Sequence, residues 1–236
     1  MNPRMRITEV EHVNLEGGYL VDGFPSVGQS SAIASESMLH TGDYKVAAVI
    51  DSDAMPPISV VRGGRPSHPT RVLANEEHRV GVFMSYLNLN QTFHKAAARA
   101  MLDWARDHGI GLVVSSVAVQ SESDGRIICI GNTDSARRKA KEAGMDILEN
   151  GTVPGIPGAL LNMGGITGQD VIVIMFHTDG KGPDFVSGAH LCMAMSKLIP
   201  GVSCDIKALE REAQKAQDIL KGAEEESRHL RDTMYG

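Results

Sequence analysis

Aromatic residues are scarce in this sequence, since only 4% of its 236 residues are Phe, Trp or Tyr. Val, Ile, Leu, Ala and the 12 methionines must therefore supply most of the core, and a hydrophobic fraction of 42% is enough for that. An excess of positive charge is also missing, because the formal net charge is −6. A nucleic acid or an anionic membrane is bound by a clustered basic surface, so this charge balance argues against both partners.

Cysteine is rare as well. Cys129, Cys192 and Cys204 are an odd number and form no CxxC pair, which is typical of free thiols in a reducing compartment. The first residues, MNPRMRITEVEH, lack the apolar segment of a signal peptide, and no apolar run is long enough to cross a bilayer. The sequence therefore predicts a cytoplasmic protein.

Short β-branched runs alternate with helical patterns over most of the chain. Several runs are apolar at consecutive positions, as expected for strands that are covered on both faces. The expected strands are Tyr19–Asp22, Val46–Ile50, Val80–Tyr86, Leu112–Val119, Arg126–Ile130 and Val171–Phe176. The expected helices are Gln91–His108, Ser135–Ala143 with Asp134 as its cap, and Asp184–Ile199. This alternation predicts an α/β fold, a three-layer sandwich with a mixed, largely parallel sheet of the phosphorylase/hydrolase-like kind.

Two segments depart from the alternation. Pro56–Glu77 has strand-like runs on either side of Gly63-Gly64 and predicts a hairpin, which makes the sheet mixed. Lys207–Thr233 has no proline and carries small or apolar residues three and four apart, so it predicts a helix about 40 Å long, packed on the body or on a sister helix. With Asp205 as N-cap, this helix divides the chain into an α/β core domain, residues 1–204, and a C-terminal helix with a protruding tail, residues 205–236.

Catalytic and metal-binding patterns are mostly absent from the sequence. The nine histidines form no HxH or HExxH pattern, no cysteine stands at zinc spacing, and there is no GxSxG motif. Asp51 and Asp53 follow an expected strand, where α/β enzymes keep catalytic groups, but acidic loops are also common there. We therefore expect no catalytic residue, no metal and no cofactor.

Two glycine-rich stretches are candidates for a ligand pocket. The first, Gly23–Gly28, joins an expected strand to a helix that begins near Val27, and a helix N-terminus can receive an anion. Its spacing fits neither GxGxxG nor the P-loop, so a tight structural turn is the competing interpretation. The second is Gly155–Gly158, where Pro157 stands close to a first helical turn. The candidate pocket residues are Gly23, Pro25, Gly28, Asp51, Asp53, Gly155 and Gly158.

Five features follow one another along the chain: the Gly23–Gly28 turn, the Met55-Pro56-Pro57 step, the Gly155–Leu161 stretch, the helix led by Asp184, and the helix after Cys204-Asp205-Ile206. In this order they resemble the PAC2 family, the archaeal and eukaryotic proteasome assembly chaperone homologues. The resemblance covers nearly the whole chain. It implies a phosphorylase/hydrolase-like fold without that enzyme chemistry, a homo-oligomer, and binding to the α-ring of the 20S proteasome.

The last three residues, Met234, Tyr235 and Gly236, match position by position the terminal hydrophobic–tyrosine–any residue motif that the resemblance implies for proteasome binding. Met234 can bury apolar surface worth about 1.5–3 kcal/mol, Tyr235 adds a ring and one hydroxyl, and the α-carboxylate can pair with a lysine between ring subunits. One tail is weak after the cost of association, whereas several tails on one oligomer bind at high effective concentration.

The sequence therefore predicts a non-enzymatic assembly chaperone or activator that docks these tails into pockets of the α-ring. One alternative is a phosphorylase- or hydrolase-like enzyme acting on a nucleoside-like small molecule near the candidate pocket residues. Another is a non-catalytic oligomeric scaffold whose tail is incidental. The sequence leaves the number of subunits open, and it leaves open whether assembly, activation or substrate delivery is the outcome.

Overall fold

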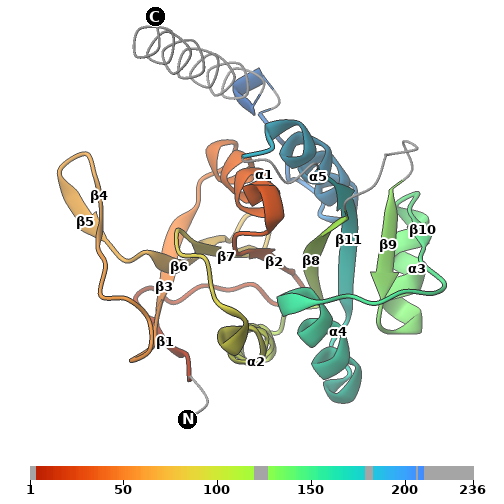
Figure 1. Cartoon of the computed structure of the whole chain (residues 1–236), viewed down its shortest axis with the longest axis horizontal. Coiled ribbons are helices and arrows are strands. Elements are labelled where there is room, and N and C mark those ends of the chain that lie inside the picture. Colours follow the sequence, from red (N-terminus) through yellow and green to blue (C-terminus); the bar gives the residue numbers. More distant parts are fainter. Residues whose placement is uncertain (1–3, 120–126, 179–182, 206, 210–236) are drawn as a thin grey trace, which may run out of the picture.

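The computed structural model describes residues 4–119, 127–178, 183–205 and 207–209 (Figure 1). Within these residues, nine strands form one sheet in the order β1-β3-β6-β7-β2-β8-β11-β9-β10. The strands are β1 (Arg6–Glu9), β2 (Tyr19–Gly23), β3 (Lys45–Asp51), β6 (Thr70–Asn75), β7 (Val80–Ser85), β8 (Leu112–Val119), β9 (Ile128–Gly131), β10 (Asp146–Ile147) and β11 (Val171–His177). Strands β4 (Val60–Arg62) and β5 (Arg65–Ser67) form a separate two-stranded sheet.

The sheet is mixed, as expected from the sequence, but the expectation that it is largely parallel was wrong, since half of its strand pairings among the described residues are antiparallel. Its four central strands, β7, β2, β8 and β11, are parallel to one another, and β10 is parallel to β9. The other pairings, β1–β3, β3–β6, β6–β7 and β9–β11, are antiparallel. Parallel pairing is therefore concentrated at the centre, where helices cover both faces and every side chain of β7 is buried.

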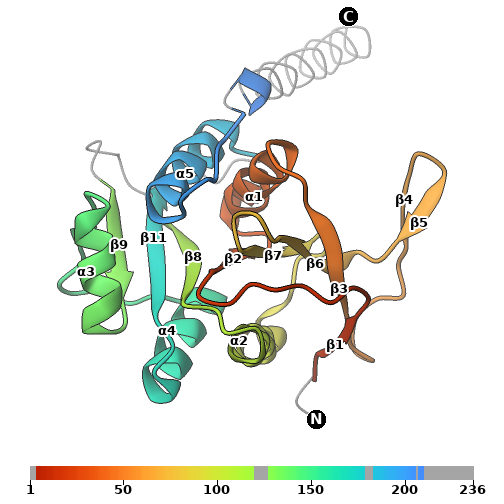
Figure 2. The same ribbon diagram turned by 180° about the vertical axis from the view of Figure 1, so that it is seen from behind.

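Helices cover the two faces of the sheet (Figures 1 and 2). On one face lie the short η1 (Val27–Gln29) with α1 (Ser30–His40), α5 (Phe185–Leu198) and α3 (Asp134–Glu142), and on the other face lie α2 (Gln91–Asp107) and α4 (Gly155–Thr167). Two hydrophobic cores result, one between each helix layer and the sheet, which confirms the three-layer sandwich.

Local sequence explains most helix boundaries. Helix α2 begins where the Asn90 side chain accepts a hydrogen bond from the Thr92 N–H at 2.8 Å, and it ends before Gly109, whose φ is 63°. The expected cap of α3 was wrong by one residue. The Thr133 hydroxyl caps this helix by accepting from the Ala136 N–H at 2.9 Å, while Asp134 is already helical and pairs with Arg137.

The expectation of three free thiols was wrong for two of them. Cys192 in α5 and Cys204 form a disulfide across 12 residues of sequence, because the Pro200-Gly201 turn folds the chain back along the helix. Cys129 is a free, buried thiol, and burial together with the charge of Asp146 raises its pKa to about 11. The argument from unpaired thiols to a reducing compartment therefore does not hold for Cys192 and Cys204.

The chain leaves the sandwich beyond α5 through a firmly held segment. The disulfide, a hydrogen bond from the Thr41 hydroxyl to the Ser203 carbonyl at 2.9 Å, and one from the Asp205 N–H to the Ser37 hydroxyl at 3.1 Å fix it. Asp205 then caps a new helical turn by accepting from the Ala208 N–H at 2.9 Å, as predicted. The rest of the expected helix and the tail, Met234-Tyr235-Gly236, lie outside the described residues, and the division at residue 204 stays a prediction.

None of the helices that the described residues form has the length and apolar character needed to span a bilayer.

Candidate functional site

The central strands β2, β7, β8 and β11 all end at one edge of the sheet, called the carboxyl edge below. Strand β3 runs in the same direction as β7, because both are antiparallel to β6. Helices α1, α2 and α5 follow β2, β7 and β11 and therefore begin at this edge. Open α/β sheets place their ligand sites at such an edge, so the candidate residues are best judged there.

A buried carboxylate stands at the end of β2. Asp22 is only 5% exposed, and its Oδ2 accepts a hydrogen bond from the buried Ser115 hydroxyl of β8 at 2.6 Å. Its Oδ1 accepts from the Phe24 N–H at 3.2 Å. Desolvation outweighs both hydrogen bonds and raises the pKa of Asp22 to about 6. Asp22 was not selected from the sequence as a candidate site residue, because it belongs to an expected apolar strand. A charged residue in such a strand is unusual, and this could have identified it.

A second polar group, formed by serine hydroxyls, lies on the α1 face of the sheet. The Ser31 hydroxyl lies 2.7 Å from the Ser116 hydroxyl and also donates to the Ser26 hydroxyl at 2.8 Å. Ser26 accepts from the Ser31 N–H as well, at 3.2 Å. These groups satisfy one another across β8, the turn after β2, and α1. They tie the α1 layer to the sheet.

The Gly23–Gly28 stretch joins β2 to η1 as predicted, and packing explains its first glycine. A Cβ atom at Gly23 would lie 2.6 Å from the Phe83 carbonyl oxygen and 2.8 Å from the Ser35 hydroxyl. Only glycine allows β2, β7 and α1 to approach this closely. Pro25 is half-buried in the turn, and Gly28 belongs to η1.

Gly155 and Gly158 begin α4, on the opposite face from α1. Gly155 has a φ of 78°, which favours glycine, and its Cβ position lies 3.8 Å from His94 Nδ1 of α2. A Cβ atom at Gly158 would lie 1.9 Å from the Val153 carbonyl oxygen, so the backbone itself occupies that space. Both glycines are therefore required by the local backbone.

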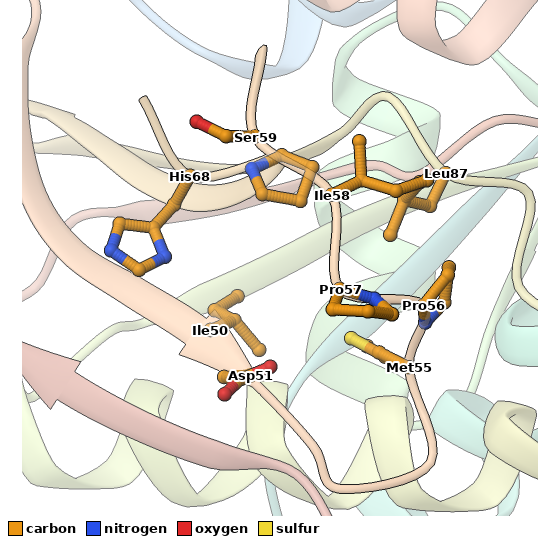
Figure 3. Close-up of a pocket in the computed structure, with 10 residues that line it drawn as sticks. Ile50, Asp51, Met55, Pro56, Pro57, Ile58, Ser59, His68 and Leu87 are labelled. Carbon is orange, nitrogen blue, oxygen red and sulfur yellow. The ribbon is translucent and has the colours of Figure 1, made fainter. Parts of the chain in front are cut away.

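Asp51 and Asp53 lie at the end of β3, and both are exposed. Asp53 forms an ion pair with Arg6 of the neighbouring strand β1, with 2.6 Å between Asp53 Oδ1 and Arg6 Nη2. Asp51 instead lines a cavity of about 320 Å³, called the arm-base pocket below (Figure 3). Its lining residues are Ile50, Asp51, Met55, Pro56, Pro57, Ile58, Ser59, His68, Pro69 and Leu87.

The seven candidate residues therefore share a sheet edge without lining one cavity. Of the seven, Asp51 alone belongs to the arm-base pocket. Strands β6 and β7 separate the end of β3 from the Gly23 turn, and Gly155 and Gly158 belong to the other helix layer. The Met55-Pro56-Pro57 step, noted in the sequence only as a family feature, forms one wall of this pocket. Across the described residues, no three His, Cys, Asp or Glu side chains are close enough to hold a metal ion.

Comparison with known proteins relates this geometry to a family. The family model for PAC2 matches residues 20–224. The chain belongs to the PAC2 family. One relative is an uncharacterised protein of Methanocaldococcus jannaschii, 23% identical over 230 residues, with 96% of this chain and 93% of the relative covered.

Two solved structures of archaeal proteins share the fold. PbaA of Pyrococcus furiosus, described as an archaeal homologue of a proteasome-assembly chaperone, has a TM-score of 0.82 at 21% identity over 97% of this chain and 95% of PbaA. PbaB of the same organism, described as an archaeal proteasome activator, has a TM-score of 0.75 at 19% identity over 95% of this chain and 100% of PbaB. The alignments span nearly the full length of all three chains, which confirms the predicted fold class.

Proposed function

We propose that this protein is a non-enzymatic, cytoplasmic chaperone or activator of the proteasome. A homo-oligomer docks its C-terminal Met234-Tyr235-Gly236 tails into pockets of the 20S α-ring. The match to the PAC2 family over residues 20–224 carries the proposal. The descriptions of PbaA as a proteasome-assembly chaperone homologue and of PbaB as a proteasome activator support it.

The way the chain leaves the sandwich also supports this role. The segment 203–205, from which the tail starts, is held in a defined place by the disulfide and by hydrogen bonds to Ser37 of α1 and to Thr41, which follows α1. From Leu209 another 27 residues follow to the end of the sequence. Each tail then contributes an apolar side chain, an amphipathic ring and a carboxylate, and several tails together overcome the cost of association.

The carboxyl edge favours a binding protein over a phosphorylase-like enzyme. A general base or nucleophile must be free to approach a substrate. The Asp22 carboxylate is buried and bound to Ser115 and Phe24, and Ser31 and Ser116 bind each other. Their hydrogen bonds are made within the sandwich instead.

Binding of purified α-rings to the immobilised protein tests the proposal. Deletion of residues 234–236 is expected to abolish binding, and Tyr235→Ala is expected to weaken it at least roughly tenfold, since a buried ring contributes well over 1.4 kcal/mol per tail. Tyr235→Phe keeps the ring and should retain most of the binding. The mass of the oligomer should not change in any of these variants. Undiminished binding by the deletion variant would refute tail docking.

A further inference from the structure

The hairpin β4–β5 and its turn, residues 60–67, form an arm that stands away from the sandwich (Figures 1 and 2). Gly63 and Gly64 at the tip have φ values of 55° and 77°, the paired positive angles of a tight hairpin turn. Val61 is 64% exposed, and Arg65 and Pro66 are also exposed. An isolated two-stranded hairpin is at best marginally stable in water, so an arm of this kind needs a surface that covers it.

The charges on the arm indicate what that surface carries. Residues 60–67, VVRGGRPS, contain two arginines and no acidic residue. Arg65 is exposed, so its guanidinium is available to a carboxylate on the covering surface. The partner of the arm is therefore expected to combine an apolar hollow with negative charge.

The arm-base pocket has this combination. Figure 3 shows Met55, Pro56, Pro57 and Leu87 on one side of it, facing Ile50 and Asp51 at the end of β3. Ile58 within the lining is still 50% exposed. Asp53, close to Asp51 in sequence, is already paired with Arg6, whereas the exposed Asp51 makes no ion pair with any described residue. Asp51 is therefore the carboxylate available to a cation from outside.

We infer that the arm of one copy of this chain seats on the arm-base pocket of a second copy, with Val61 in the apolar hollow and Arg65 paired with Asp51. An arm cannot fill its own pocket, because Ser59 and His68 at its two roots are part of the pocket wall. The arm and the pocket adjoin each other, so a two-fold axis beside them brings each arm over the other copy's pocket, and both contacts form at once.

This contact deepens the proposed function, on which it rests for the need to present several tails from one body. Its evidence is separate, since it lies at β3–β5 while the tail root lies beyond α5. A copy joined through its arm keeps its own C-terminal segment. Loss of the contact therefore lowers the number of tails per particle without changing any tail.

The mass of the particle in solution, measured by sedimentation and light scattering at a fixed concentration, tests the inference. Val61→Asp places a charge in the apolar hollow and is expected to lower the mass roughly twofold or more. Ile166→Asp is the matched control, because Ile166 is 87% exposed on α4, away from the arm, and its mass should stay that of the wild type. Unfolding temperatures close to the wild type's would show that the variants fold. A wild-type monomer, or a Val61→Asp variant of unchanged mass, overturns the inference.

A charge exchange tests the pairing itself. Arg65→Glu puts two like charges at each contact, and so does Asp51→Arg, so each variant alone is expected to dissociate. A mixture of the two variants contains one native and one exchanged ion pair per two-fold contact, and association should return. A mixture that stays dissociated would refute the Arg65–Asp51 pairing. Failure of this inference can be told apart from failure of tail docking. The arm variants change the mass of the particle, whereas deletion of residues 234–236 changes α-ring binding at unchanged mass.

Discussion

The wild-type protein is expected to lose unfolding free energy as the pH rises, because Asp22 ionises while buried. Asp22→Asn is expected to remove this loss. The pKa of Asp22 is raised from 3.8 to about 6 because the carboxyl group is buried. Between these two values the folded protein holds a proton that the unfolded chain releases. The stabilisation from this proton is fully present below pH 3.8, and it is lost as the pH rises through about 6.

The size of the effect follows from the pKa difference. A shift of about two units corresponds to about 3 kcal/mol of unfolding free energy, by which the ionised carboxylate disfavours folding above pH 6. Asparagine has the same shape and no charge. Its oxygen can still accept from the Phe24 N–H, and its amide can donate to the Ser115 hydroxyl. The variant is therefore expected to match the wild type near pH 4 and to exceed its stability by up to about 3 kcal/mol at pH 8.

Urea denaturation followed by circular dichroism, at intervals between pH 4 and 8, measures this difference. The protein concentration must be the same throughout, because the stability of an oligomer depends on it. The difference between wild type and variant cancels all other titrating groups. Glu149→Gln, at an exposed carboxylate beyond β10 and outside the arm-base pocket, is the control and should show no such trend. A difference that stays constant with pH, or a wild type that gains on the variant as the pH rises, would show that burial does not govern Asp22.

Two further predictions concern the core and the tail root. Cys204→Ser is expected to lower the unfolding free energy by roughly 3 kcal/mol in the absence of reductant, because the disulfide closes a short loop. The wild type in excess dithiothreitol should fall to the same value in chemical denaturation, and equal stability of all three samples would contradict the pairing. Gly23→Ala is expected to cost about 1–3 kcal/mol, because its Cβ would lie 2.6 Å from the Phe83 carbonyl oxygen. Gly165→Ala in α4, where no atom lies within 4 Å of the Cβ position, should instead gain up to about 1 kcal/mol; thermal unfolding compares the two, and an equal response would refute the packing argument.

Buried elements were predictable from the sequence because their signals are local. Leu112–Val119 matches β8 at both ends, and the other expected strands fall on observed ones, since an apolar run covered on both faces leaves a continuous pattern. Strand β1 was not predicted, because Arg6–Glu9 is mostly exposed at the edge of the sheet and therefore has no continuous apolar pattern. The order of the strands and the partner of Cys192 depend on how the chain folds back, which no short pattern encodes.

The candidate site was predictable only in part, for the same physical reason. The Gly23–Gly28 turn follows from local glycine spacing, and the structure places it between β2 and η1. The arm-base pocket takes residues from three separate stretches, 50–59, 68–69 and 87, which only the pairing of β3, β6 and β7 brings together. Asp51 was identified as a strand-end carboxylate, but its apolar surroundings could not be seen before those strands were paired.

The carboxyl edge thus divides into two parts with different consequences. Around β2 and β8, where α/β enzymes hold their reacting groups, Asp22 binds Ser115 on one face of the sheet, and the Ser31 and Ser116 hydroxyls bind each other on the other face. Around β3 and β7, the Pro56-Pro57 loop and the arm leave apolar side chains and a carboxylate in contact with solvent. A protein that exposes apolar surface at a defined hollow gains from covering it with another chain. The fold therefore leaves apolar side chains and the Asp51 carboxylate accessible beside β3, while the polar side chains around β2 and β8 make their hydrogen bonds inside the sandwich.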